Sequence, residues 1–146
     1  MGVETERKYL VKNNGYRSLA KERHTIKQGY LQREPERTVR MRTKDDHGYI
    51  TVKGKTTGCS RMEFEYEIPY EDALQMLSLC AGRIIEKTRY IVEHDGMLWE
   101  IDEFEGDLSP LVVAEIELPA PDYQYTLPDF IGEEVTGDAK YYNSNL

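Results

Sequence analysis

The chain has 146 residues and a mass of 17.0 kDa, the size of a single domain with room for a hydrophobic core. Its 27 acidic and 19 basic residues leave a net charge of −8, which argues against a protein that binds long nucleic acids or anionic membranes. The two cysteines, Cys59 and Cys80, are too few for a disulfide framework and lack the spacing of a zinc site. No segment approaches the 18 apolar residues of a membrane-spanning helix, and the first residues lack the apolar segment of a signal peptide. We therefore expect a cytoplasmic protein with free thiols and no membrane association.

Apolar and polar residues alternate along most of the chain, which is the period of a half-buried β-strand. Turn residues at 45–48 and 94–96 connect successive segments so tightly that the strands they join must be antiparallel. The predicted strands span residues 3–11, 25–32, 37–44, 49–55, 61–69, 83–93, 97–104 and 111–118.

Helix signals are fewer than strand signals. Residues 70–79 place Ala73, Leu74 and Leu77 on one face and are followed by Gly82, a plausible stop. Residues 15–22 are consistent with one short helix, and the tail from Pro128 with a last helical piece after a loop at 119–128. No repeat or linker divides the chain, so the sequence predicts one domain over residues 1–146.

The charged residues on the predicted strands share an unusual sign pattern. Their ordinary interpretation is a solvated sheet face opposite an apolar one. A solvated face normally mixes charge signs, however, because like charges on one face repel. Here most strands carry one sign at alternate positions, as in Arg40/Arg42, Lys53/Lys55, Glu63/Glu65, Lys87/Arg89, Glu100/Asp102 and Glu115/Glu117.

A closed barrel that turns these charged faces inward removes the repulsion. Eight strands suffice to close a small barrel around one ligand, with the predicted helices covering the apolar outer faces. Arginine and lysine suit phosphate oxygens, and carboxylates at i, i+2 converge on hard cations such as Mg²⁺ or Mn²⁺. The predicted fold is therefore α+β and mostly β: an eight-stranded antiparallel closed barrel with a few outer helices and a charged lumen.

The order of these pairs carries a family resemblance. The N-terminal Glu4-x-Glu6-x-Lys8 is similar to the ExExK signature of the CYTH family, the triphosphate tunnel metalloenzymes. The later pairs follow in the family's order, and the tail 135–145 resembles the closing segment in which a short helix can plug one tunnel mouth. The resemblance covers nearly the whole chain and implies a tunnel that binds a small triphosphate with Mg²⁺ or Mn²⁺.

The resemblance also implies a role for each charged residue. The implied metal ligands are Glu4, Glu6, Asp102, Glu115 and Glu117. The implied triphosphate contacts are Lys8, Arg40, Arg42, Lys53, Lys55, Lys87 and Arg89. The residues expected to take part in catalysis are Glu4, Glu6, Lys8, Glu63, Glu65 and Lys87, with Glu63 and Glu65 binding a second metal or orienting the attacking water.

These residues predict a metal-dependent hydrolase of inorganic tripolyphosphate or a small organic triphosphate. A class IV adenylyl cyclase or a thiamine triphosphatase is the alternative enzyme, and a non-catalytic polyphosphate- or triphosphate-binding module is the alternative without chemistry. The expected partner is a small triphosphate, with no long nucleic acid and no membrane, and a homodimer stays open.

Overall fold

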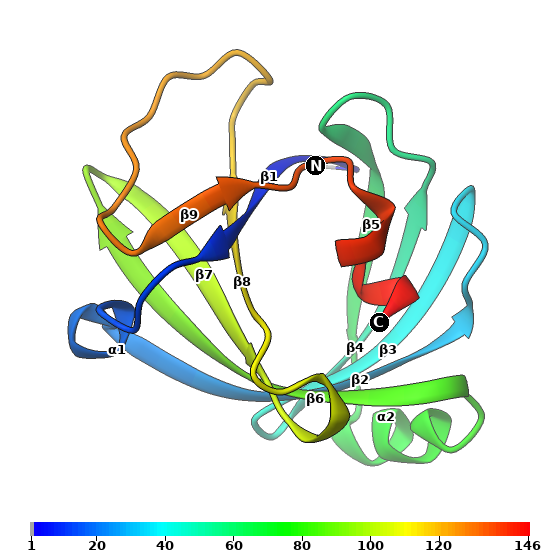
Figure 1. The fold of residues 1–146 in the computed structure, drawn as a ribbon. Coiled ribbons are helices and arrows are strands. Elements are labelled where there is room, and N and C mark those ends of the chain that lie inside the picture. Colours follow the sequence, from blue (N-terminus) through cyan, green and yellow to red (C-terminus); the bar gives the residue numbers. More distant parts are fainter. Residues whose placement is uncertain (1) are drawn as a thin grey trace.

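Alternating strands curl into a closed barrel in the computed structural model, which describes residues 2–146 (Figure 1). The strand order is β5-β4-β3-β2-β6-β7-β8-β1-β9, every pair is antiparallel, and an added pairing of β5 with β1 closes the sheet. The strands are β1 (Val3–Val11), β2 (Glu22–Gln32), β3 (Arg37–Lys44), β4 (His47–Gly54), β5 (Ser60–Ile68), β6 (Ala81–His94), β7 (Met97–Phe104), β8 (Val112–Glu117) and β9 (Ile131–Glu134).

Closure depends on β1, which changes partners along its length. Its first residues pair with β5, in the register Val3↔Met62, while its second half pairs with β8. β9 extends the edge of β1 beyond β5, with Val11 opposite Ile131. The predicted eight-stranded barrel is thus confirmed, with one extra short strand at its side.

The turns predicted near residues 45–48 and 94–96 join β3 to β4 and β6 to β7 in the structure. Asp45 and Asp95 adopt positive φ angles of 53° and 49°, which aspartate tolerates in tight turns between antiparallel strands. The helix predicted at 70–79 is α2 (Tyr70–Leu77), and the one predicted at 15–22 is the single turn α1 (Tyr16–Leu19).

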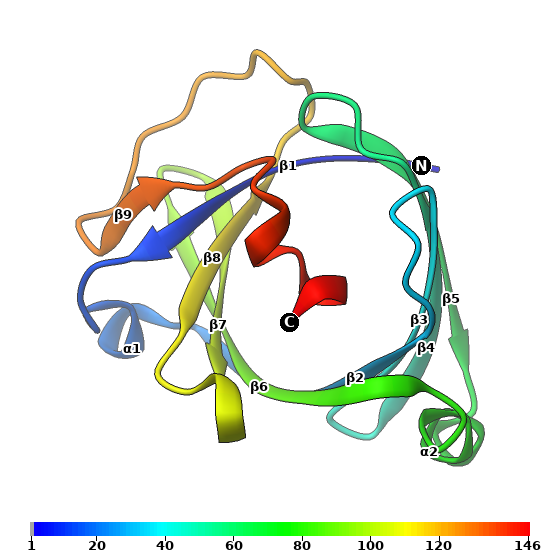
Figure 2. The same cartoon turned by 45° about the vertical axis from the view of Figure 1, so that its right-hand side comes forward.

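The C-terminal segment differs from its prediction. Residues from Pro128 do not continue as a helix, because β9 forms first and the chain ends in two 3₁₀ turns, Ala139–Tyr141 and Asn143–Asn145. A further 3₁₀ turn, Gly106–Leu108, lies before β8. Figure 2 shows the terminal turns inside the ring of strands, so this segment is positioned by the barrel rather than by its own helix propensity.

The hydrophobic core lies outside one wall of the barrel. Trp99 is fully buried there and packs on Tyr9 and Tyr125, with ring centroids 5.6 and 5.9 Å away. The sequence predicted that helices cover this wall. The structure differs, because β9 and the loop carrying Tyr125 supply much of the cover (Figure 1). A second apolar cluster of Ile85, Phe104 and Val113 packs against the terminal Leu146.

The contact between α2 and β4 leaves no space at Gly48. A Cβ atom there would lie 2.6 Å from the Ala73 Cβ and 3.1 Å from the Ile68 carbonyl oxygen. We expect Gly48→Ala to destabilise the fold by about 1–3 kcal/mol, because overpacked cores must shift backbone. Thermal unfolding measures this, with Gly54→Ala as the matched control on the same strand, since its nearest atom would be 3.6 Å away. Equal melting temperatures for both variants would contradict the prediction.

Across residues 2–146 the structure contains no helix that is both long enough and apolar enough to cross a membrane.

Candidate active site

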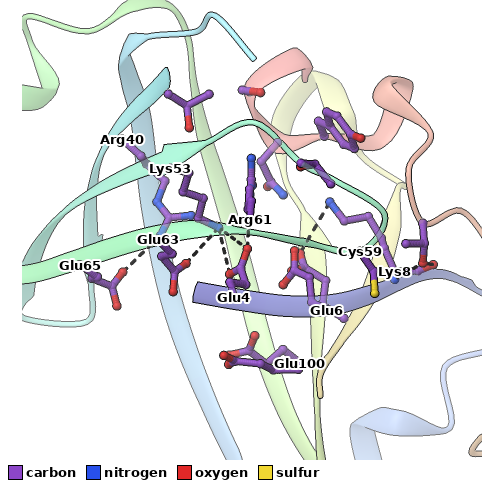
Figure 3. A pocket seen from close by; sticks show the side chains of 18 of the residues that line it. Glu4, Glu6, Lys8, Arg40, Lys53, Cys59, Arg61, Glu63, Glu65 and Glu100 are labelled. Atoms are coloured by element: carbon purple, nitrogen blue, oxygen red, sulfur yellow. Dashed lines mark hydrogen bonds and ion pairs between the residues drawn. The ribbon is translucent and has the colours of Figure 1, made fainter. Parts of the chain in front are cut away.

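The charged strand faces meet in a cavity of about 180 Å³ inside the barrel (Figure 3). Its lining is polar and comes from strands far apart in the sequence, together with the C-terminal segment. Eleven of the predicted site residues line it: Glu4, Glu6, Lys8, Arg40, Arg42, Lys53, Glu63, Glu65, Arg89, Glu115 and Glu117.

The structure places three predicted residues elsewhere. Lys55 follows the end of β4, is exposed and does not line the cavity, because the strand ends at Gly54 before its alternation can turn this side chain inward. Lys87 and Asp102 point inward but lie below the cavity, where both are almost fully buried.

Glu4 is the centre of a group of opposite charges at one side of the cavity. The Lys53 Nζ lies 3.2 Å from both Glu4 carboxylate oxygens and 3.2 Å from Glu63 Oε2, and the Arg61 Nε lies 3.4 Å from Glu4 Oε1 (Figure 3). Burial and a hydrogen bond to Glu4 raise the pKa of Glu63 to about 7. Burial also raises the pKa of Glu4, but Lys53 and the Glu63 proton outweigh it and hold that pKa below its usual value.

Glu6 and Glu115 form a second close pair of carboxyl groups. Burial and the charges of Glu115 and Glu4 raise the pKa of Glu6 well above its usual value. Burial opposes ionisation of Glu115 too, yet Lys8 and a hydrogen bond from Glu6 keep the pKa of Glu115 well below normal. In each pair, one carboxyl group has a raised pKa and its neighbour a lowered one.

These pairs suit a divalent cation that is shared with a substrate. Within residues 2–146 no three histidine, cysteine, aspartate or glutamate side chains converge into a ready-made metal cage. Magnesium is usually held by one or two carboxylates together with substrate phosphates and water, so a cage is not required. A divalent cation would neutralise the paired carboxylates, and this set of oxygen donors fits the hard metal that the sequence predicted.

The carboxyl pairs also predict how stability depends on pH. Because the folded pKa values of Glu63 and Glu6 lie above those of the unfolded chain, the folded protein binds more protons between about pH 4 and 7. The free energy of unfolding without divalent cations should therefore fall as pH rises through this range. Thermal unfolding in a chelator from pH 5 to 7 measures it, and Glu63→Gln should flatten the decline. A melting temperature that rises over this range would contradict the prediction.

Three buried guanidinium groups form the basic side of the cavity. Arg40 donates from Nη2 to Thr51 Oγ1 at 3.1 Å and to Glu65 Oε1 at 3.3 Å, but its buried Nε has no partner within residues 2–146. Burial and the charges of Arg40 and Arg89 lower the pKa of Arg42 to about 9. Positive charge is thus in excess here, so an anion would both accept from Arg40 and relieve the repulsion.

Arg42 and Arg89 are held in place by their own partners. Arg42 donates from Nε and Nη2 to Gln28 Oε1, at 3.0 and 2.7 Å. Arg89 forms a two-pronged ion pair with Asp102, at 2.8 and 2.9 Å, and reaches Glu100 at 3.1 Å. Burial raises the pKa of Asp102, but Arg89 and Lys87 outweigh it and hold that pKa far below its usual range. Both Asp102 oxygens are therefore occupied by cations of the protein.

The C-terminal segment completes the cavity from inside the barrel. Asn143 Oδ1 accepts from Lys87 Nζ at 3.1 Å and from Gln28 Nε2 at 3.2 Å. The Lys8 Nζ donates to the Tyr141 carbonyl, and Arg33 Nη1 donates to the Ser144 carbonyl at 2.7 Å. The closing segment therefore contacts two of the predicted triphosphate-binding lysines, as 3₁₀ turns instead of the helix implied by the resemblance.

Several lining residues have no site role in the sequence-based predictions. Arg61 is in phase with Glu63 and Glu65, so the alternation could have identified it, and Glu100 was placed on the charged face with Asp102 but given no role. Gln28 and Tyr30 lie on the inward side of β2 without a charge, and nothing in the pattern distinguished them from core residues. Asn143 could not be found from the sequence, because only the folded path of the tail brings it here.

Comparison with known proteins adds to this geometry. A curated protein from Acetivibrio thermocellus named inorganic triphosphatase is 49% identical and covers 100% of this chain and 94% of its own length. A second protein of that name, from Nitrosomonas europaea, is 36% identical and covers 99% of this chain and 96% of itself. A crystal structure described as an inorganic triphosphatase superposes with a TM-score of 0.68 at 33% identity, covering 97% of this chain and 92% of its own. The CYTH domain matches residues 2–142, and the chain therefore belongs to the CYTH family.

Proposed function

We propose that this protein is an inorganic triphosphatase, which hydrolyses a phosphoanhydride bond of tripolyphosphate in the barrel cavity. The observation that carries the proposal is the buried Arg40, whose Nε lacks a partner within residues 2–146 and which faces a cavity where positive charge is in excess on one side. Paired carboxyl groups lie on the other side of that cavity. This arrangement suits a condensed phosphate that carries a divalent cation. The names of the two curated relatives support the same substrate class.

The basic residues bind and orient the phosphate chain in this proposal. Arg40, Arg42 and Arg89 donate to its non-bridging oxygens, because guanidinium groups match phosphate geometry and stay charged. Lys8 and Lys53 contribute point charges from β1 and β4. Since these groups are fixed by protein partners, they can stabilise charge that develops on the leaving phosphate without first reorganising.

We assign the cation to the carboxylates of Glu4, Glu6, Glu115 and Glu117. When bound, Mg²⁺ or Mn²⁺ neutralises phosphate charge and lowers the pKa of a coordinated water. We assign Glu63 and Glu65 of β5 to orienting the attacking water, and the pKa of Glu63 near 7 supports this role, because such a group can accept a proton at neutral pH. For Asp102 we propose a positioning role toward Arg89 and Lys87 in place of metal ligation, since both its oxygens already accept from cations.

The size of the cavity favours an inorganic substrate over a nucleotide. The cavity has a volume of about 180 Å³ and is lined chiefly by charged and hydroxyl groups, with no broad apolar surface for a base.

The free thiols at Cys59 and Cys80 agree with a reducing compartment, so we place the activity in the cytoplasm.

Phosphate release from tripolyphosphate, ATP and thiamine triphosphate, each with Mg²⁺ or Mn²⁺, tests the proposal. We expect tripolyphosphate to give the highest kcat/KM and no turnover after chelation. Cyclic AMP as the main product from ATP would identify a cyclase instead, and preference for thiamine triphosphate would identify the other alternative. Tight triphosphate binding without turnover under either metal would identify a binding module.

A further inference from the structure

Asn143 brings a neutral amide group to the basic side of the cavity. The residue begins the last 3₁₀ turn of the chain, which lies inside the ring of strands (Figure 2), and it lines the cavity. Its side-chain oxygen Oδ1 accepts from Gln28 Nε2 at 3.2 Å and from Lys87 Nζ at 3.1 Å. These two contacts fix the side chain, but they use only one of its two polar atoms.

The neighbours of Asn143 determine which way its amide points. Arg42 donates from Nε and Nη2 to Gln28 Oε1, and a guanidinium group has no acceptor atom. The oxygen of Gln28 must therefore face Arg42, and its nitrogen faces Asn143. Because this nitrogen is a donor, the atom of Asn143 that meets it has to be the oxygen. The Nδ2 group of Asn143 consequently lies on the other arm of the amide.

This Nδ2 group is available to a ligand in the cavity. Both side-chain hydrogen bonds of Asn143 within residues 2–146 use Oδ1, so its two N–H groups have no partner there. Gln28 is fully buried and Lys87 is 1% exposed, and neither lines the cavity, so Oδ1 faces the interior beneath it. Asn143 itself is half-buried and lines the cavity, which leaves Nδ2 as the polar atom that it presents to a ligand.

We propose that Asn143 is a substrate-binding residue, which donates from Nδ2 to a non-bridging oxygen of the bound phosphate chain. The inference rests on the proposed function, because it takes that substrate as given. A neutral donor suits this place, since Arg40, Arg42 and Arg89 already crowd positive charge here and another cation would add to their repulsion. A hydrogen bond to a charged oxygen is also stronger than one between neutral groups. Since Gln28 holds the amide in place, little side-chain freedom is lost on binding.

Two substitutions separate this role from a purely structural one. Asn143→Asp keeps an oxygen that accepts from Gln28 and Lys87, but it replaces the Nδ2 donor by a second oxygen. Asn143→Leu has a similar shape and removes both donor and acceptor without adding charge. We expect each variant to raise KM for tripolyphosphate at least about tenfold, because a hydrogen bond to a charged group is lost. The rise should be larger for Asn143→Asp, whose second oxygen repels the phosphate, and its kcat should stay within about threefold of the unmodified value.

Two further measurements accompany the kinetics. Calorimetric titration with tripolyphosphate in a chelator measures affinity where no turnover is expected, and the dissociation constant should rise in both variants. Thermal unfolding measures the structural contribution of Oδ1. Asn143→Asp should melt no lower than the unmodified chain, because Lys87 and Gln28 keep their acceptor, whereas Asn143→Leu should melt lower.

Lys140→Gln is the control for charge. It makes the C-terminal segment more negative by one unit, as Asn143→Asp does, but Lys140 is exposed and does not line the cavity. We expect its KM to stay within about twofold of the unmodified chain, because exposed charges contribute little. If Asn143→Leu does not fold, the comparison of Asn143→Asp with Lys140→Gln decides the question, and equal KM values would overturn the inference.

Two results with folded variants would also overturn it. Asn143→Asp with an unchanged KM would make Asn143 only a structural anchor of the C-terminal segment. A raised KM for Asn143→Asp alone, with Asn143→Leu unchanged, would show that added charge causes the effect. In both cases hydrolysis by the unmodified chain would leave the proposed function intact. An unmodified chain that neither binds nor hydrolyses tripolyphosphate would overturn the proposed function and this inference together.

Discussion

Replacing Arg40 by alanine is expected to lower kcat/KM for tripolyphosphate by about 10²- to 10³-fold without unfolding the protein. The guanidinium group is buried against the cavity, and its Nε has no acceptor within residues 2–146 until an anion arrives. The partner that Arg40 would leave, Glu65, has a side chain that is 42% exposed, so water can solvate it and the cost to the fold is small, whereas the transition state loses a fixed donor. Steady-state phosphate release measures the loss, and thermal unfolding checks the fold.

Arg37→Ala is the control for this experiment. Arg37 lies on the same strand, but its side chain is 64% exposed and pairs with Glu34 at the surface. We expect its activity to match the unmodified chain within about twofold, since it does not line the cavity. If both variants lose activity equally, or if Arg40→Ala retains it, Arg40 does not bind the substrate and the proposed function loses its main support.

Replacing Asp102 by asparagine is expected to destabilise the fold by about 3–5 kcal/mol. Asp102 is buried beneath the cavity with Lys87 at 2.7 Å and Arg89 at 2.8 Å. The variant would remove the ion-pair partner of the buried Lys87 and leave Arg89 with Glu100, which is a larger cost than losing an exposed ion pair. Urea unfolding measures the free energy of unfolding.

The matched control is Glu93→Gln on β6, where Glu93 is 57% exposed and pairs with Lys21 at 3.3 Å. It should change the free energy of unfolding by less than about 1 kcal/mol. The double variant Asp102→Asn with Lys87→Met should recover part of the loss, because it removes the unpaired charge of Lys87. A loss below about 1 kcal/mol for Asp102→Asn would show that water or another group compensates the cations, and Asp102 would then be free to act as a ligand.

The sequence predicts which side chains face the inside of the barrel better than it predicts which of them line the cavity. Arg40 and Arg42 share a strand, so alternation alone placed them on one face, and the structure confirms that both line the cavity. Lys55 is two residues after Lys53, so alternation predicts that it faces inward as well. The prediction fails because β4 ends at Gly54, and alternation holds only within a strand. The alternation also could not distinguish residues that line the cavity from residues buried beneath it. Lys87 is in phase with Arg89, yet it is buried beside Phe104 and does not line the cavity.

The sequence by itself determined the strands, the tight turns and the separation of charged from apolar faces, because these depend on residues a few positions apart. It also determined that like charges on a strand needed opposite charges from elsewhere. Only the tertiary structure decided which charges meet. The Glu4–Glu63 and Glu6–Glu115 pairs depend on closure of β1 against β5 and β8, and the contact of Asn143 with Lys87 depends on the path of the tail through the barrel; each joins residues more than fifty positions apart. No local pattern specifies such contacts, since burial and register fix them only when the barrel closes.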